Sequence, residues 1–154
     1  MSLGLPRTHL LTRTTHVPLP REEVFAFFAE AENLGRITPP ELDFSIARAP
    51  DEMVQGAIIE YRLALFGIPF GWRTEISRWE PPRLFVDEQR KGPYRVWHHT
   101  HTFEEEDGGT RVDDAVRYAL PLYPLGEVAH PIVRWQLDRI FDFRQKAIRE
   151  LLGA

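Results

Sequence analysis

Apolar and polar residues alternate along much of the first 120 residues, and this period of two is typical of half-buried β-strands. Short connections rich in Pro, Gly and Asp separate the alternating segments, as they do in hairpins. We therefore predict an antiparallel meander. Its strands are expected at residues 8–17, 42–49, 57–66, 70–80, 84–89, 95–104 and 110–120.

A broken pair of helices is predicted between the first two strands. Val24, Phe27 and Phe28 have the spacing of one helical face. Asn33 then ends or bends this helix, and a second short helical piece follows before the prolines at 39–40.

A long amphipathic helix is predicted over residues 131–152, with Arg144 inside its apolar stripe. The order strand, broken helix pair, strands and long helix predicts an α+β fold, in which the last helix covers one face of a curved antiparallel sheet. Such a sheet leaves a cleft beneath the helix, where small ligands usually bind. The length and the absence of a linker predict one domain over residues 1–154.

Composition and charge narrow the possible functions. The formal charge of −4, with scattered basic residues, argues against nucleic-acid binding. The chain has no cysteine, so we expect a protein of the reducing cytoplasm. No apolar run approaches the roughly 20 residues of a membrane span, and no glycine cluster forms a phosphate-binding loop. We expect neither a membrane span nor a cofactor.

The stretch GPYRVWHHTHTF at residues 92–103 places two imidazoles on the core side of a predicted strand. Trp97, His99 and His101 share one parity, so their side chains point the same way. This arrangement is unusual for a core, because each buried polar group needs a partner.

The next hairpin supplies a possible partner. The Asp-Gly pair at 107–108 is typical of a two-residue turn, which would put His101 opposite Asp114 and Trp97 opposite Tyr118. A turn one residue later would keep the same faces but shift the pairing. We expect Asp114 on the same face as the two histidines.

These three residues allow several interpretations. His99 and His101 could share a zinc ion with Asp114 as third ligand, or they could be buried rings that bond to carboxylates. A His101–Asp114 pair could also transfer protons to and from a carbonyl compound. We assign no metal, and no serine or cysteine nucleophile stands in a recognisable context.

Large aromatic residues are expected on the same inner face, either as core or as the wall of a pocket. They are Tyr61, Trp72, Trp97, Tyr118 and Trp135. Their mixture with imidazoles and an acid favours a pocket, because a dry core does not need these polar groups.

The chain resembles the START-like, Bet v 1-like (SRPBCC) superfamily of polyketide-cyclase-type and lipid-carrier domains. VPLPREEVFAFFAEAENLGRITPP resembles its first strand and helix pair, and the segment from PLYPLGEVAH to AIREL its last helix. DEQRKGPYRVWHHTHTF followed by GTRVDDAVRYALP is similar to a bacterial subgroup that is sometimes labelled cell-division inhibitor. The resemblance implies a helix-grip fold: a curved seven-stranded antiparallel sheet around a long C-terminal helix, with a cavity between them.

The resemblance also bears on the strand LFVDEQ, whose alternation alone leaves its inner face open. It implies that Asp87 and Gln89 point inward with the histidines.

We expect the chain to bind a hydrophobic, partly oxygenated small molecule such as a lipid, quinone or polyketide. The alternative is a cyclase or aromatase-like enzyme that uses His101 and Asp114 for proton transfer. The candidate ligand-binding residues are Tyr61, Trp72, Asp87, Gln89, Trp97, His99, His101, Asp114, Tyr118 and Arg144. Ligand identity, turnover and oligomeric state stay open.

Overall fold

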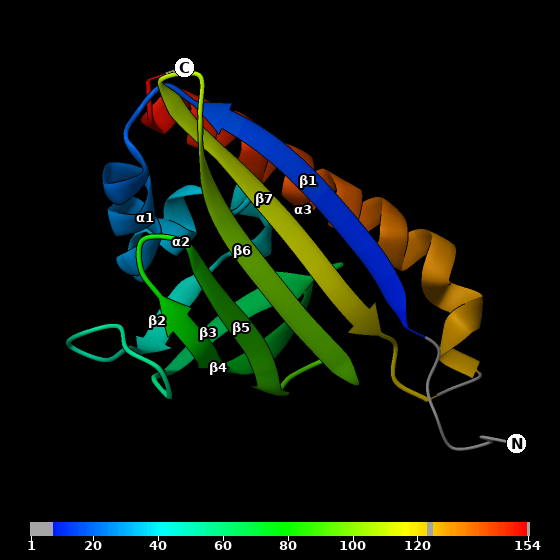
Figure 1. Ribbon diagram of the computed structural model, residues 1–154. Helices are drawn as coiled ribbons and strands as arrows, with labels where there is room; N and C mark the ends of the chain where they lie inside the picture. Colours follow the sequence, from blue (N-terminus) through cyan, green and yellow to red (C-terminus); the bar gives the residue numbers. More distant parts are fainter. Residues whose placement is uncertain (1–7, 123–124, 154) are drawn as a thin grey trace, which may run out of the picture.

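The computed structural model describes residues 8–122 and 125–153 (Figure 1). Seven strands form one antiparallel sheet in the order β1-β7-β6-β5-β4-β3-β2. The strands are β1 (His9–Val17), β2 (Ser45–Arg48), β3 (Ile58–Leu65), β4 (Ile68–Glu80), β5 (Leu84–Lys91), β6 (Val96–Glu106) and β7 (Gly109–Ala119). The helices are α1 (Arg21–Ala29), α2 (Asn33–Arg36) and α3 (His130–Leu151), with 3-10 turns η1 (Pro40–Leu42) and η2 (Leu125–Ala129). The predicted helix-grip fold is confirmed.

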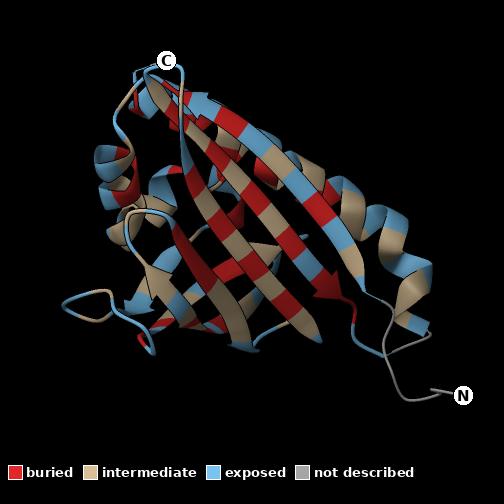
Figure 2. Ribbon diagram, in the orientation of Figure 1, coloured by how far each residue is buried: buried red, intermediate tan, exposed pale blue. Residues whose placement is uncertain are grey.

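The β6–β7 hairpin has the predicted turn and register. Asp107 and Gly108 have φ values of 49° and 78°, as a two-residue turn with two left-handed positions requires. His101 therefore lies opposite Asp114 in the sheet. Buried and less buried residues alternate along β6 and β7, which appear as banded ribbons in Figure 2.

Two predicted strands begin two or more residues away from the expected position, whereas the other five begin within one residue of it. The strand expected at 42–49 is shortened to β2, because residues 40–42 form the 3-10 turn η1. The strand expected at 70–80 begins earlier, at Ile68. The reason is a two-residue turn at Phe66 and Gly67, which have φ values of 52° and 78° and pair Leu65 with Ile68.

The long helix α3 packs against the inner face of the sheet and closes the core. Ile148 is fully buried in one cluster with Phe103 of β6 and Phe25 of α1, so α1, α3 and the sheet share one apolar contact region. A second cluster contains Leu137 of α3 and Val116 of β7. Within the described part of the chain, no helix is both long and apolar enough to cross a membrane.

We expect Phe103→Ala to lower the free energy of unfolding by about 3–5 kcal/mol. Phe103 has no exposed surface and packs against Phe25 and Phe85, so its truncation leaves a cavity that the neighbours cannot fill. Urea unfolding measures the change. Leu10→Ala is the control, because Leu10 is 57% exposed and its truncation should change stability by less than about 0.5 kcal/mol. Equal effects of the two variants would contradict this description of the core.

Candidate functional site

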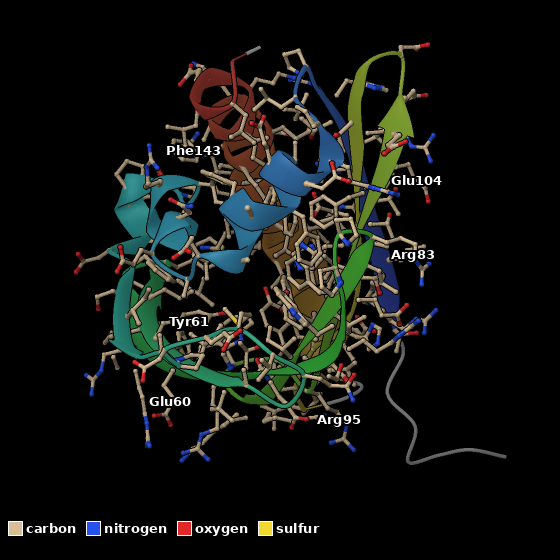
Figure 3. The ribbon with its side chains drawn as sticks, turned by 60° about the vertical axis from the view of Figure 1, so that its left-hand side comes forward. Glu60, Tyr61, Arg83, Arg95, Glu104 and Phe143 are labelled. Atoms are coloured by element: carbon tan, nitrogen blue, oxygen red, sulfur yellow. The ribbon has the colours of Figure 1, made fainter. Side chains whose placement is uncertain are left out.

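A cavity of about 150 Å³ lies between the inner face of the sheet, α3 and the α1–α2 pair. In Figure 3, Tyr61 on β3 points to the inside, whereas its neighbour Glu60 points away from it. The apolar lining includes Phe27, Phe28, Leu42, Phe44, Ile59, Leu63, Trp72, Ile76, Trp79, Phe85, Tyr94, Trp97, Leu137, Ile140 and Phe141. The hydrophobic surface of this cavity suits an apolar ligand.

Four aromatic side chains form one wall of the cavity. The rings of Tyr61 and Trp72 stack with centroids 5.8 Å apart, and Trp72 meets Trp97 edge to face at 5.3 Å. Tyr94 lies 4.9 Å from Trp97. Nε1 of Trp72 is buried and has no hydrogen-bond partner among the described residues. This wall therefore holds a buried donor for which the described part of the chain supplies no acceptor.

Two histidines and two aspartates form a polar wall across β5, β6 and β7. Nε2 of His101 donates to Oδ2 of Asp87 at 2.5 Å, and Nε2 of His99 donates to Oδ1 of Asp114 at 2.8 Å. The two imidazoles stack with centroids 3.6 Å apart. The carboxylates thus hold both rings in fixed orientations.

Arg144 joins this wall to α3. Its Nη2 donates to Oδ1 of Asp114 at 3.3 Å and lies 3.4 Å from Nδ1 of His101. Its guanidinium carbon lies 5.2 Å from the centroid of Phe28, within cation–π distance. The arginine in the apolar stripe of α3 therefore compensates the charge of the Asp114 carboxylate. A buried carboxylate without such a partner would be strongly destabilising.

The two imidazoles have opposite pKa shifts. Burial lowers the pKa of His101, but the hydrogen bonds that His101 donates to Asp114 and Asp87 outweigh burial and raise it. For His99, burial and the charge of the neighbouring His101 lower the pKa to about 4. When one of the two stacked rings carries a proton, that ring is therefore His101.

Both carboxyl groups stay ionised. Burial acts to raise the pKa of Asp114, but Arg144 and the histidines hold it well below its usual range. Burial also acts to raise the pKa of Asp87, but the charges of the two histidines outweigh burial and lower it. The hydroxyl of Tyr61 is kept protonated, because burial and the charge of Asp87 raise its pKa well above its usual value.

Most of the residues expected from the sequence meet at this cavity. Those that line it are Tyr61, Trp72, Asp87, Trp97, His99, His101 and Arg144. Three others do not. Gln89 hydrogen-bonds the backbone of Tyr94, Asp114 lies behind the histidines, and the Tyr118 hydroxyl contacts His130 at 2.9 Å.

His101 contacts Asp114 as expected, but its shorter hydrogen bond goes to a second carboxylate, that of Asp87. His101 faces Asp114 across the sheet and Asp87 faces His99, yet each ring makes its short hydrogen bond to the other carboxylate. The reason is that imidazoles are long enough to reach diagonal neighbours on the same face. His101 keeps only a 3.4 Å approach of Nδ1 to Asp114.

One aromatic prediction was wrong and one lining residue was missed. Trp135 is 66% exposed on α3 and does not face inward. Tyr94 is buried in the wall, but it lies in the connection before β6, where alternation gives no signal. The only signal of its role in the sequence is that it is an aromatic residue next to Pro93.

Asp87, His99 and His101 could together hold a metal ion, because one ligand atom of each lies within 4.8 Å of the others. The third ligand offered by this geometry is Asp87 and not Asp114. Arg144 disfavours a cation here, since its guanidinium already lies 3.4 Å from His101.

Comparison with known proteins places this architecture among described families. A sequence profile described as polyketide cyclase / dehydrase and lipid transport matches residues 17–143. A comparison with curated protein sequences finds no match.

Solved structures share the fold at low sequence identity. The Zhui aromatase/cyclase from Streptomyces sp. R1128 has a TM-score of 0.76 and 14% identity, over 96% of this chain and 98% of that one. A START superfamily protein from Mycobacterium smegmatis has a TM-score of 0.67 and 12% identity, over 93% and 99% of the two chains. The ginseng major latex-like protein 151 from Panax ginseng has a TM-score of 0.67 and 10% identity, over 96% and 99%.

The opposite pKa shifts predict a stability maximum near the ordinary histidine pKa of 6.5. The raised pKa of His101 adds stability that is complete below pH 6.5 and is lost as the pH rises through the folded-state pKa. The lowered pKa of His99 adds stability that is complete above pH 6.5 and is lost as the pH falls toward about 4. Each change is on the order of 1 kcal/mol per unit of pKa shift.

Urea unfolding as a function of pH measures both slopes. His101→Gln should remove the alkaline slope and His99→Gln the acidic one, while His16→Gln, at an exposed position on β1, serves as control. Imidazole ¹⁵N shifts give an independent reading of which ring carries the proton. A protonated His99 beside a neutral His101 at neutral pH would contradict the assignment.

Proposed function

Because the chain belongs to the polyketide cyclase / dehydrase and lipid transport family, within the START-like and Bet v 1-like superfamily, we propose that it binds a small, hydrophobic, partly oxygenated molecule in its cavity. The observation that carries this proposal is the combination of an apolar cavity with a single polar wall. The apolar part of the ligand fills the cavity, and an oxygen of the ligand faces the polar wall.

The aromatic wall supplies a donor for a second oxygen. Trp72 lines the cavity, and its Nε1 is a buried donor that no described residue accepts from. An unpaired buried donor costs about 1–3 kcal/mol, which a ligand carbonyl would recover. The protonated hydroxyl of Tyr61, whose ring stacks on Trp72, adds a further donor. These groups favour a ketone or quinone oxygen over a hydrocarbon.

The size of the cavity limits the ligand. A volume of about 150 Å³ is close to that of the engineered lysozyme cavity that binds benzene, and smaller than the roughly 300–1,000 Å³ of pockets for drug-sized molecules. A compact ligand of one or two rings is therefore favoured.

Proton-transfer catalysis is the second candidate function. The observation in its favour is that His101 and Asp87 both line the cavity and share a 2.5 Å hydrogen bond. Asp87 is the more accessible aspartate, with a side chain 18% exposed against 1% for Asp114. The acid–base pair that can reach a ligand is therefore His101–Asp87, and it could remove a proton next to a carbonyl group.

Binding is tested with 1,4-naphthoquinone and naphthalene, which differ only in the two oxygens and the redox state of the ring that bears them. Trp72→Phe should weaken binding of the quinone about 5–10-fold and leave that of naphthalene nearly unchanged, because it removes one N–H donor. Tryptophan fluorescence quenching or calorimetry measures both affinities. Trp135→Phe, the same substitution at an exposed site, is the control. If the wild type binds neither compound, nor any member of a panel of quinones and aromatic ketones, the proposal fails.

Catalysis is tested separately by the rate at which 2-tetralone exchanges its α-protons in D₂O, followed by NMR. If the pair is an acid–base catalyst, the wild type should accelerate exchange, and His101→Gln should reduce this acceleration by about 10²-fold or more. Asp87→Asn should have a similar effect. A protein that binds 2-tetralone without accelerating exchange would keep the binding function and exclude enolisation chemistry on this probe.

A further inference from the structure

Three residues with metal-binding side chains meet at the end of the molecule where β1 and α3 begin. His9 is the first residue of β1, Glu127 lies in η2, and His130 is the first residue of α3. Figure 1 shows these element ends close together, at the far end of α3 from α1. None of the three lines the cavity. The cluster is separate from the proposed ligand site.

The geometry brings one ligand atom of each residue within 4.8 Å of the other two. Nε2 of His9 lies 2.8 Å from Oε2 and 3.0 Å from Oε1 of Glu127, and the rings of His9 and His130 stack with centroids 3.7 Å apart. Ligand atoms on a tetrahedral zinc ion, with bonds of about 2.0–2.2 Å, lie roughly 3.3–3.6 Å apart. The distance between His9 and Glu127 is shorter than this value, so these two side chains would separate slightly to share an ion. Rotation of the imidazoles out of their parallel stack would complete the coordination.

The chemistry of the three ligands selects the class of ion. Two imidazoles and a carboxylate suit Zn²⁺ and its transition-metal neighbours, whereas Mg²⁺ and Ca²⁺ prefer oxygen ligands throughout. We infer that His9, Glu127 and His130 form a binding site for a divalent transition-metal ion of the Zn²⁺ type, with a fourth position for water.

The surroundings of the cluster support such a site. The side chains of His9 and Glu127 are only 11% and 20% exposed. The buried Tyr118 hydroxyl lies 2.9 Å from Nε2 of His130 and offers this ring the kind of second partner that ligating histidines commonly have. Arg134 hydrogen-bonds the Tyr118 hydroxyl, but it also donates to Asp138 at 3.2 Å. The carboxylate of Asp138 compensates the charge of Arg134. In contrast, the cavity histidines lie against Arg144.

The test is calorimetric titration of the full, tag-free chain with ZnCl₂ after treatment with EDTA. The wild type should bind one equivalent of Zn²⁺, and Co²⁺ should give the visible absorption of a tetrahedral site with nitrogen and oxygen ligands. Zn²⁺ should also raise the melting temperature, because only the folded chain brings the ligands together. Mg²⁺ should produce none of these effects.

Variants locate the ion. His9→Ala and His130→Ala should each weaken Zn²⁺ binding about tenfold or more, and Glu127→Gln does the same with little change of volume. His16→Ala, on the same strand as His9 but 67% exposed, should leave the affinity unchanged. Circular dichroism confirms that each variant is folded. The inference is overturned if the folded wild type binds no Zn²⁺, or if binding survives His9→Ala and is lost in His101→Asn, which would place the ion in the cavity.

Discussion

The buried carboxylate of Asp114 is the constraint on which the arrangement of the site depends. Its side chain is 1% exposed, and an ionised carboxylate in such a position is strongly destabilising without partners. His99 supplies one hydrogen bond from β6, and Arg144 supplies another from α3. α3 can therefore dock in one register only, with its arginine over this carboxylate. That register also decides which face of α3 closes the cavity.

The cavity follows from unequal filling on either side of this polar wall. On the α1 side, Phe25 and Phe103 pack ring against ring and leave little space. Beyond the wall, toward β3 and β4, the sheet curves away from α3. Tyr61 and Trp72 then line the space with rigid rings rather than filling it. The same sheet thus provides a solid core at one end and a ligand-sized space at the other.

Alternation and turn chemistry are local properties, and they predicted the sheet and the inner faces of β6 and β7, whereas the inner face of β5 came from the family resemblance. The Asp107–Gly108 turn decided the register of β6 and β7, and with it which residues lie opposite each other. Sequence reasoning could not predict that His101 bonds to Asp87, since a diagonal contact depends on the position of a third strand. Nor could it exclude Tyr118 from the cavity, because its contact with His130 depends on where α3 begins. Tyr94 was missed because a connection between strands has no periodicity to read.

The charges of the polar wall bear on the kind of ligand that it can face. The guanidinium of Arg144 balances one of the two ionised carboxylates, Asp87 and Asp114, and a proton on His101, whose pKa is raised, makes the wall as a whole close to neutral. A neutral wall has little attraction for an anionic ligand, and the stacked imidazoles cannot both be charged at 3.6 Å without strong repulsion. A ligand carbonyl does not require a net positive charge on the wall, since it needs only a hydrogen-bond donor. Because Asp114 is sealed behind the rings, it acts on the ligand only through the orientation of His99 and the charge of His101. Asp87 is then the carboxylate that contacts a bound molecule directly, and the chemistry of the cavity depends on whether the proton that Asp87 accepts comes from the ligand or from His101.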